Sequence, residues 1–395
     1  MKAVTWHGHR DVRVEEVPDP TLQEPNDAIV RITSSGLCGS DLHLYETLAP
    51  FMEPGDVVGH EPMGIVEEVG SAVTTLRPGD RVVVPFNVSC GSCWMCDQKL
   101  YSQCETTQNH EHGTGASFFG YSKLYGHVPG GQAEYLRVPF GDFLPVKVPE
   151  GPSDDRFLFL SDVLPTAWQG LKYAAVPDGG TLLVLGAGPI GDMAARMAVH
   201  AGHRVISVDR IPERLARVEQ FGAEPLNLDE AEKVGGVAEI VREATGGRGA
   251  DAVIDAVGME AHGSPGAQGV QKLVGLLPDA VAEPMTKKAG VDRLAALYTA
   301  FEAVRRGGTV SISGVYGGAA DPIPMMQLFD KQIQLRMGQA NVRAWTDELL
   351  GVLRDGDPWG VESFATHHLP LADAADAYAR FQKKEDGFVK VVFRP

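Results

Sequence analysis

Residues 181–191 read TLLVLGAGPIG, an apolar run that leads into the spacing Gly-x-Gly-x-x-Gly. The run predicts a buried strand, and the apolar pattern that continues toward His200 predicts a helix directly after the turn. Such a turn brings the backbone close to a pyrophosphate, whose charge is stabilised at the helix N-terminus. A glycine-rich turn without a ligand is the alternative, but the strand and the helix around it favour a dinucleotide site. Its predicted residues are Gly186, Gly188, Pro189, Ile190 and Gly191.

An acidic residue ends the next predicted strand, 204–209. Asp209 lies 18 residues beyond Gly191, and a carboxylate there accepts hydrogen bonds from the adenosine ribose and repels a 2′-phosphate. Arg210 follows directly, and a guanidinium beside the ribose can accommodate that phosphate, or it can be a solvated surface charge. We therefore predict NAD as the cofactor, with NADP as the less favoured alternative.

The regions around this unit predict two domains. After about residue 164, strand-like runs alternate with helical patterns, which predicts an α/β fold with a doubly wound parallel sheet, a Rossmann domain. Before it, short β-rich runs between Gly and Pro turns predict a mostly β domain. A chain of 395 residues also exceeds what one hydrophobic core fills. We expect a Rossmann domain at 163–336, inserted in a catalytic domain formed by 1–162 and 337–395.

The composition excludes several classes of partner. The formal net charge is −17 and no dense block of Lys and Arg occurs, whereas nucleic acids and anionic membranes require a concentrated positive field. The first 17 residues carry no apolar signal core, and no run approaches the ~18 apolar residues of a membrane span. We expect a cytoplasmic protein that acts on a small molecule and binds neither nucleic acid nor membrane.

Four of the five cysteines lie close together in the sequence, at Cys90, Cys93, Cys96 and Cys104. Four thiolates on one short segment are what a closed tetrahedral zinc site requires. A redox-active Cys-x-x-Cys pair is the alternative, but it does not need four clustered thiols. We predict a structural zinc in a lobe formed by residues 88–106.

A second metal site is predicted from three separate segments. Cys38 lies in GLCGSDLH, His60 in GHEPMG and Asp162 in LSDVLPT. A catalytic zinc needs three N, O or S ligands and one open position, and these three residues would supply them. A lone cysteine such as Cys38 is otherwise more often a buried apolar residue.

These motifs resemble the medium-chain, zinc-dependent alcohol dehydrogenases. The resemblance rests on the GHE segment, the four-cysteine lobe, GGQAEY at 130–135, the glycine-rich turn and the order of the domains. It implies a GroES-like catalytic domain around the Rossmann domain, two zinc ions per chain and a homo-dimer or homo-tetramer. It also implies interconversion of an alcohol with an aldehyde or ketone by hydride transfer with NAD(H).

Within that family, two features resemble the glutathione-independent formaldehyde dehydrogenases. These are Asp162 as the third zinc ligand and a long insertion, residues 259–290, after DAVG at 255–258. In that branch the insertion covers the adenine end of the cofactor, slows NAD release and permits aldehyde dismutation. A surface loop or an oligomer contact is the equal alternative for the insertion.

The resemblance also implies roles for residues beside the ligands. Ser40 and His43 match a proton relay, for which imidazole is suited because its pKa lies near neutrality; a turn hydroxyl and a surface histidine are the alternatives. Thr166 resembles the residue that packs on the nicotinamide ring. Glu61 matches a possible alternate zinc ligand, although a supporting role is slightly favoured. Asp41 would hold the second imidazole nitrogen of His60, or else cap a turn.

Two other functions compete with this prediction. One is a non-catalytic dinucleotide-binding protein, and the other is a zinc-free quinone or enoyl reductase of the same superfamily. Neither needs the combination of Cys38, His60 and Asp162 with Ser40 and His43. We therefore expect an enzyme, a zinc-dependent and NAD-dependent alcohol dehydrogenase.

Overall fold

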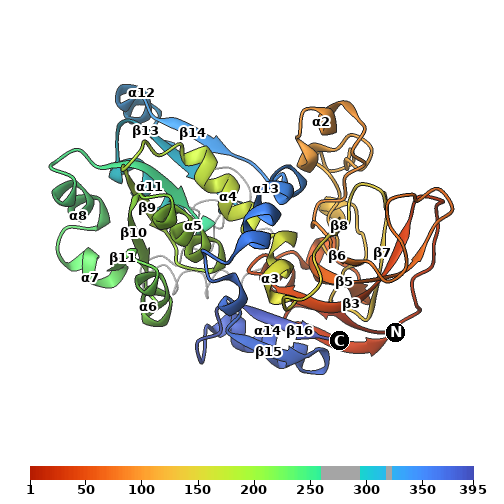
Figure 1. Ribbon diagram of the computed structural model, residues 1–395. Coiled ribbons are helices and arrows are strands. Elements are labelled where there is room, and N and C mark those ends of the chain that lie inside the picture. The colour runs from red at the N-terminus through yellow and green to blue at the C-terminus, as the bar shows by residue number, and fades with distance from the viewer. Residues whose placement is uncertain (259–293, 317–322) are drawn as a thin grey trace. The chain divides into compact units, whose positions relative to one another are not determined.

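The computed structural model describes residues 1–258, 294–316 and 323–395 (Figure 1). The chain divides into two compact units, Met1–Thr166 together with Ala340–Pro395, and Ala167–Gln339. The insertion predicted at 259–290 lies outside the described residues. We infer that the two units correspond to the two domains expected from the sequence.

The second unit contains one six-stranded parallel sheet, with the strand order β11-β10-β9-β12-β13-β14. The order reverses at β9, as it does in a Rossmann sheet, and ligands bind such sheets at this point. The structure confirms the predicted doubly wound fold. Its strands are β9 Thr181–Leu185, β10 Arg204–Asp209, β11 Glu224–Asn227, β12 Ala250–Asp255, β13 Val304–Ile312 and β14 Gln334–Met337.

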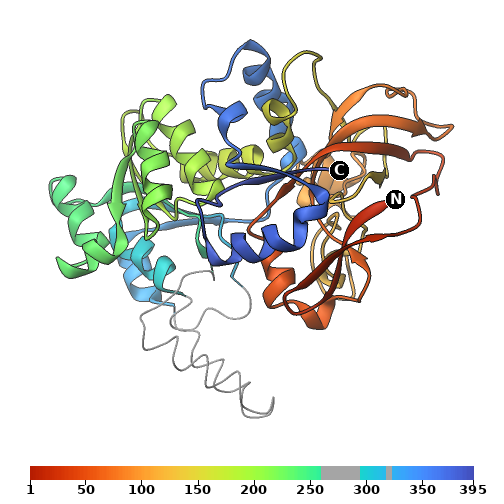
Figure 2. The same cartoon turned by 90° about the horizontal axis from the view of Figure 1, so that it is seen from below.

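Helices cover both faces of this sheet, as Figure 2 shows. On β9, Leu183 and Leu185 belong to a core with α8 and α11, while Leu182 and Val184 are buried on the opposite face. Strands buried on both faces explain the continuous apolar run at 182–185. The helices are α4 Val163–Ala174, which begins in the first unit, α5 Pro189–His200, α6 Pro212–Gln220, α7 Leu228–Lys233, α8 Val237–Ala244, α11 Ala295–Ala303 and α12 Met325–Lys331.

The first unit is built on two sheets. One has the order β2-β1-β4, and the other has the order β15-β16-β3-β5-β6-β8, with β7 also paired to β3. The last strand lies antiparallel to β3, with Val391 opposite Leu37, so the end of the chain completes this sheet. The strands are β1 Lys2–Gly8, β2 Asp11–Glu16, β3 Ala28–Leu37, β4 Asp56–Val57, β5 Glu61–Val69, β6 Arg81–Val83, β7 Tyr135–Val138, β8 Val146–Lys147, β15 His367–Pro370 and β16 Val391–Arg394.

Short helices connect and cover these strands. They are α1 Asp41–Glu46, α2 Trp94–Asp97, α3 Asp155–Leu158, α13 Val342–Asp355 and α14 Ala374–Lys383, with 3-10 turns at Ala49–Phe51, Tyr101–Gln103, Lys123–Tyr125, Phe159–Ser161, Val361–Ser363 and Leu371–Asp373. None of the helices in the described ranges has both the length and the apolar character needed to span a bilayer.

Candidate functional site

Four largely buried side chains with metal-binding atoms meet in the first unit. They are Cys38, His60, Glu61 and Asp162, and one ligand atom of each lies within 4.8 Å of the others. Gly36 of β3 pairs with Glu61 of β5. This pairing brings Cys38, which follows β3, close to His60, which precedes β5. Asp162 follows a 3-10 turn and directly precedes α4. The fold thus brings together the three predicted ligands, although they come from distant parts of the sequence.

The donor atoms of these residues are close enough to share one cation. Cys38 Sγ lies 3.3 Å from Asp162 Oδ2, and His60 Nε2 lies 3.6 Å from the same oxygen. The other oxygen, Oδ1, accepts a hydrogen bond of 2.7 Å from Thr166 Oγ1, which orients the carboxylate. Thiolate sulfur, imidazole nitrogen and carboxylate oxygen are ligands that zinc prefers, and three of them leave a fourth position open. The residues present therefore fit a catalytic zinc.

The negative charges around the cluster also favour the binding of a cation. Burial lowers the pKa of His60, but the carboxylates of Asp41 and Asp162 outweigh this effect, and the net pKa is raised. Burial and the charge of Asp162 raise the pKa of the Cys38 thiol to about 11. In the metal-free protein both groups hold protons near neutral pH, so a bound metal has to displace them.

Asp41 fixes the orientation of the His60 ring. Its Oδ1 lies 3.0 Å from His60 Nδ1, and both side chains are buried. Its Oδ2 accepts hydrogen bonds from the backbone N–H of Cys38 at 3.0 Å and from Gln132 Nε2 at 3.2 Å. Gln132 Oε1 in turn accepts from the Tyr378 hydroxyl. A proton on Nδ1 directed at Asp41 leaves Nε2 available to a metal, an arrangement common to metal-binding histidines.

The two predicted relay residues lie at the start of α1. Ser40 Oγ lies 3.1 Å from His60 Nε2 and 3.3 Å from Cys38 Sγ, so its hydroxyl belongs to the cluster. His43 follows within α1 and is half-buried. The relay itself stays a prediction.

Two sets of residues at this cluster were missed from the sequence. The first is aromatic: the rings of Phe86 and Tyr121 lie edge-on to His60, at 6.0 and 6.5 Å between centroids, and Phe118 stacks on Tyr125. These rings form an apolar wall beside the imidazole. The density of aromatic residues in FFGYSKLY at 118–125 was an available signal. The second is Lys390, whose ammonium bonds to Glu61 and which no local motif marks.

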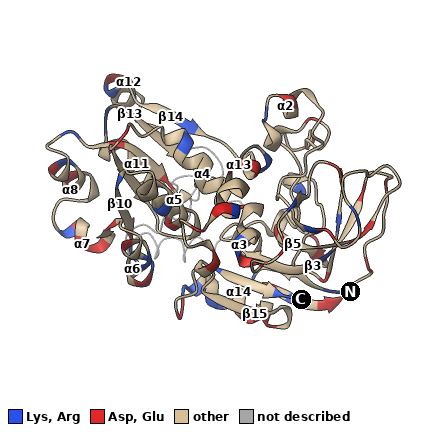
Figure 3. Ribbon diagram, in the orientation of Figure 1, with Lys and Arg blue, Asp and Glu red and all other residues tan. Residues whose placement is uncertain are grey.

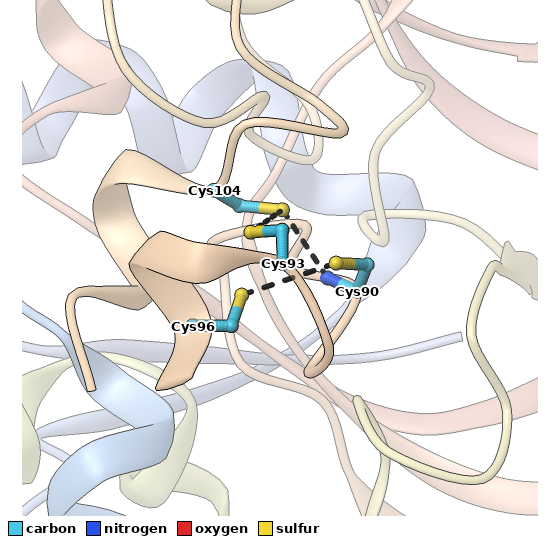
Figure 4. A group of neighbouring side chains, drawn as sticks. All are labelled: Cys90, Cys93, Cys96 and Cys104. Carbon is cyan, nitrogen blue, oxygen red and sulfur yellow. Dashed lines mark hydrogen bonds between the residues drawn. The ribbon is translucent and has the colours of Figure 1, made fainter. Parts of the chain in front are cut away.

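The four cysteines of the 88–106 lobe form a second cluster (Figure 4). Cys90 Sγ and Cys96 Sγ lie 4.0 Å apart, and Cys93 Sγ and Cys104 Sγ lie 3.9 Å apart. No disulfide joins them. Four sulfurs bound at ~2.3 Å around one tetrahedral zinc would lie about 3.8 Å from one another. The spacing of the sulfurs therefore fits a closed zinc site.

Hydrogen bonds favour the thiolate form of two cysteines of this lobe, Cys90 and Cys93. Burial alone would raise the pKa of Cys90, but the hydroxyl of Thr106 and the backbone N–H of Ser92 donate to its sulfur and lower the pKa to about 6. The backbone N–H of Glu105 donates to Cys93 Sγ at 3.3 Å. Thiolate is the form that binds zinc, so these donors stabilise the metal-binding state.

The glycine-rich turn has the geometry expected of a dinucleotide site. Gly186 has φ +88°, and a Cβ on Gly191 would lie 1.7 Å from the Gly186 carbonyl oxygen. Both positions therefore require glycine. Gly188 is the N-cap of α5, Pro189 is its first residue and Ile190 its second. The helix α5 therefore begins within the glycine-rich segment 186–191.

Asp209 lies beside this turn, at the end of β10. Its Oδ2 accepts a hydrogen bond from Ala187 N at 2.8 Å. Arg210 turns to other carboxylates, since its Nε lies 3.1 Å from Asp229. Arg214, which was not singled out from the sequence, has its Nη1 3.6 Å from Asp209 Oδ2. Asp209 and Arg214 therefore lie where the adenosine ribose is expected.

Comparison with known proteins agrees with this fold and these clusters. The alcohol dehydrogenase GroES-like domain matches residues 24–150, and the zinc-binding dehydrogenase family matches residues 189–271. A zinc-type alcohol dehydrogenase-like protein, AdhB of Bacillus subtilis, is 40% identical over all of both chains. The formaldehyde dismutase of Pseudomonas putida is 34% identical, over 97% of this chain and 95% of that protein.

A solved structure extends the comparison. The alcohol dehydrogenase TADH from Thermus sp. ATN1 superposes with a TM-score of 0.81 and is 36% identical in sequence. The match covers all of this chain and 99% of that protein. The fold and the two clusters define a zinc-type oxidoreductase with a GroES-like and a Rossmann domain. This chain belongs to the medium-chain, zinc-dependent alcohol dehydrogenase family.

Proposed function

We propose that this protein is a zinc-dependent and NAD-dependent dehydrogenase that interconverts an alcohol and an aldehyde or ketone. The observation that carries the proposal is the buried set of Cys38, His60 and Asp162, with donor atoms within 4.8 Å of one another. A zinc ion held there would act as a Lewis acid on the substrate oxygen. A nicotinamide bound with the glycine-rich turn would accept or return the hydride.

The residues around the ligands have separate tasks. Asp41 keeps the His60 ring in place and Thr166 orients the Asp162 carboxylate. Ser40 Oγ, at the cluster, takes the proton of the substrate hydroxyl, and His43 passes it toward solvent. By resemblance, Thr166 also packs against the nicotinamide. Glu61 is proposed as a residue of the metal site rather than of proton transfer.

The four-cysteine lobe is proposed to hold a second, structural zinc. Its four thiols provide a complete ligand set, which leaves no position for a substrate. The protein should therefore contain two zinc ions per chain. Five cysteines without a disulfide agree with a reducing compartment, and we propose the cytoplasm.

For the cofactor we propose NAD rather than NADP. The carboxylate of Asp209 lies at the turn, and Arg210 is engaged by Asp229 and Glu232. Arg214 beside Asp209 favours the NADP alternative, because its guanidinium could meet a 2′-phosphate. Comparing kcat/KM for the two cofactors decides between them, and an Arg214→Ala variant reports whether Arg214 contributes to phosphate binding.

A more specific candidate is a formaldehyde dehydrogenase or an aldehyde dismutase. The similarity to the formaldehyde dismutase of Pseudomonas putida supports it. The aromatic wall of Phe86, Phe118 and Tyr121 beside His60 also favours a compact substrate. Incubation of the purified protein with formaldehyde alone separates the activities, because a dismutase forms formate and methanol without added NAD.

The first experiment is to measure metal and nucleotide on the protein as purified. We expect two zinc ions per chain, and one in a Cys38→Ser variant. Stoichiometric NAD released by acid would support the dismutase, and its absence an ordinary dehydrogenase. One zinc or none in the unaltered protein would contradict the catalytic zinc site.

We also propose that the protein is a homo-oligomer, through a surface formed by α12 and β14. Of the ten exposed large apolar side chains in the described residues, seven lie on this segment and at its approach: Val315, Ile323, Met325, Met326, Phe329, Leu335 and Met337. Together they expose on the order of 700 Å², near the ~800 Å² that each partner buries in a standard interface. We name these seven residues the α12–β14 patch.

Two further features favour a second copy of this chain as the partner. β14 is the edge strand of its sheet, and an edge strand can pair with its own copy across a two-fold axis. Two copies of a protein with net charge −17 repel each other. This repulsion is weakest where the two surfaces in contact carry few acidic side chains. Residues 323–337 contain a single acid, Asp330, which is paired with Arg306. Figure 3 shows the charged residues of α12 and β14 by colour.

A further inference from the structure

A lysine that the proposed chemistry does not use lies fully buried beside the catalytic cluster. Lys390 directly precedes β16, and its side chain has no exposed surface. Its Nζ donates to Glu61 Oε1 at 2.5 Å and to the Leu37 carbonyl at 3.1 Å. A buried ammonium is stable only with a counter-charge and hydrogen-bond acceptors, and these two groups provide both.

Glu61 is held by only one of its two oxygens. Oε2 is buried, and no described residue hydrogen-bonds to it. A carboxylate oxygen of Glu61 lies within 4.8 Å of the ligand atoms of Cys38, His60 and Asp162. A Cβ on Gly36 would lie 2.2 Å from Oε2, so the glycine leaves the space that this oxygen occupies. The carboxylate is thus within a small movement of the proposed metal position.

The charges of the site explain why a lysine is required. A Cys38 thiolate and an Asp162 carboxylate together balance the charge of one zinc ion. Glu61 adds a further negative charge in a buried place, and Lys390 is the cation that contacts it. Without this lysine, Glu61 would have no ion-pair partner among the described side chains, and a metal in the site would be its counter-charge.

We infer that Lys390 is a positioning residue that keeps Glu61 off the zinc and so keeps the fourth coordination position open for substrate. The inference rests on the zinc site of the proposed function. It follows that loss of Lys390 converts three protein ligands into four, the ligand number of a closed structural site. The metal should then bind more tightly while turnover falls, whereas general damage to the site would weaken both.

The test uses the full-length protein loaded with Co²⁺, whose visible absorption reports the number and type of ligands. The spectrum of the Cys38→Ser variant is subtracted from that of each protein. The difference contains the cobalt absorption of the catalytic site without that of the four-cysteine lobe. The variants are Lys390→Met, Lys390→Arg, Glu61→Gln and the double variant K390M/E61Q. Lys331→Met is the control, because Lys331 is a partly buried lysine of the second unit that donates to the carbonyls of Phe301 and Glu302, which belong to α11.

We expect Lys390→Met to change the cobalt bands, to slow removal of the metal by a chelator about 10-fold to 100-fold, and to reduce kcat at least 10-fold. Lys390→Arg and Lys331→Met should keep the original bands. The double variant should match Glu61→Gln in spectrum and release rate, because Lys390 acts through Glu61.

Faster metal release from Lys390→Met than from the unaltered protein would overturn the inference. So would a release rate that differs more than threefold between K390M/E61Q and Glu61→Gln, and this comparison remains decisive if Lys390→Met alone does not fold. A failure of the zinc site itself has a different signature: the unaltered protein would show no cobalt absorption that depends on Cys38, and the inference would fall with the site.

Discussion

His60 Nδ1 lies 3.0 Å from Asp41 Oδ1, and the two side chains are buried together beneath the proposed metal site. Asp41 also accepts from the backbone N–H of Cys38, so one carboxylate orients two of the three proposed ligands. Such supporting carboxylates raise the basicity of the imidazole and fix its ring. We therefore expect Asp41, which lies just after β3, to increase the affinity of this site for zinc.

We predict that Asp41→Asn lowers zinc affinity at the catalytic site 10-fold to 100-fold, because the His60 ring loses its anionic partner. The measurement is competition with a chelator, which should leave the zinc of the cysteine lobe in place. Asp27→Asn is the control, since Asp27 is equally buried in the same unit and pairs with Arg137 away from the site. Equal zinc affinity in Asp41→Asn and the unaltered protein would contradict the prediction.

The protonation of the same site predicts how metal binding depends on pH. The raised pKa values of His60 and Cys38 keep both groups protonated near neutrality in the metal-free protein. Zinc binding must release these protons, so the apparent affinity should rise as the pH rises from about 6 to 8. Calorimetry in buffers of different ionisation enthalpy measures the proton release. An affinity that does not change over this range would be inconsistent with the proposed ligands.

The cysteine lobe should lose its metal and its local order together. We predict that Cys104→Ser reduces the zinc content by one ion per chain and increases proteolysis within 88–106, because the lobe has only a small apolar core of its own. Limited proteolysis with mass spectrometry locates the cuts. Ser92→Ala, a change in the same lobe that keeps all four thiols, should remain resistant; equal cutting in both variants would argue against a structural zinc.

Asp154 is expected to govern stability in acid. Burial raises its pKa, but hydrogen bonds from Ser34 and Thr33 and the charge of Arg81 outweigh burial and lower it below its ordinary value of 3.8. A folded-state pKa below the unfolded value means that the stabilisation is complete above that ordinary value and is lost as the pH falls through the folded-state pKa.

Asp154→Asn should therefore destabilise the fold by about 3 kcal/mol at pH 7, because Arg81 is left buried without its partner. The loss should shrink as the pH falls below about 4. Denaturant unfolding at pH 7 and at lower pH values tests this, with the exposed Asp347→Asn as control. A destabilisation that stays constant with pH would show that Asp154 contributes through packing alone.

The α12–β14 patch predicts the oligomeric state. We expect the unaltered protein to be at least a dimer by light scattering, and the variant M326E/F329E to shift toward monomer, because four carboxylates would face each other across the interface. Val234→Glu is the control, since Val234 is also an exposed apolar residue of the second unit. A monomeric unaltered protein, or an unchanged mass in M326E/F329E, would rule out this interface.

The sequence by itself determined the features whose residues are neighbours along the chain. The glycine-rich turn at 186–191 and the cysteines at 90–104 require a fixed local geometry, so their spacing predicts both the structure and the ligand. The alternation of strands and helices after residue 164 is also a pattern of neighbours along the chain, and it predicted the parallel sheet. Cys38, His60 and Asp162 were predicted from the ligands that a catalytic zinc requires. Because no local spacing joins them, that prediction was supported mainly by the resemblance to a family.

Only the tertiary structure decided which distant residues meet. Lys390 and Glu61 are separated by 329 positions, and β16 must pair with β3 before their side chains can touch. A buried lysine looks like any other lysine in the sequence, because burial depends on the packing of several strands and helices at once. The pairing of Arg210 with Asp229 and Glu232 and the exposure of the α12–β14 patch likewise depend on the folded surroundings of these side chains, which no sequence pattern encodes.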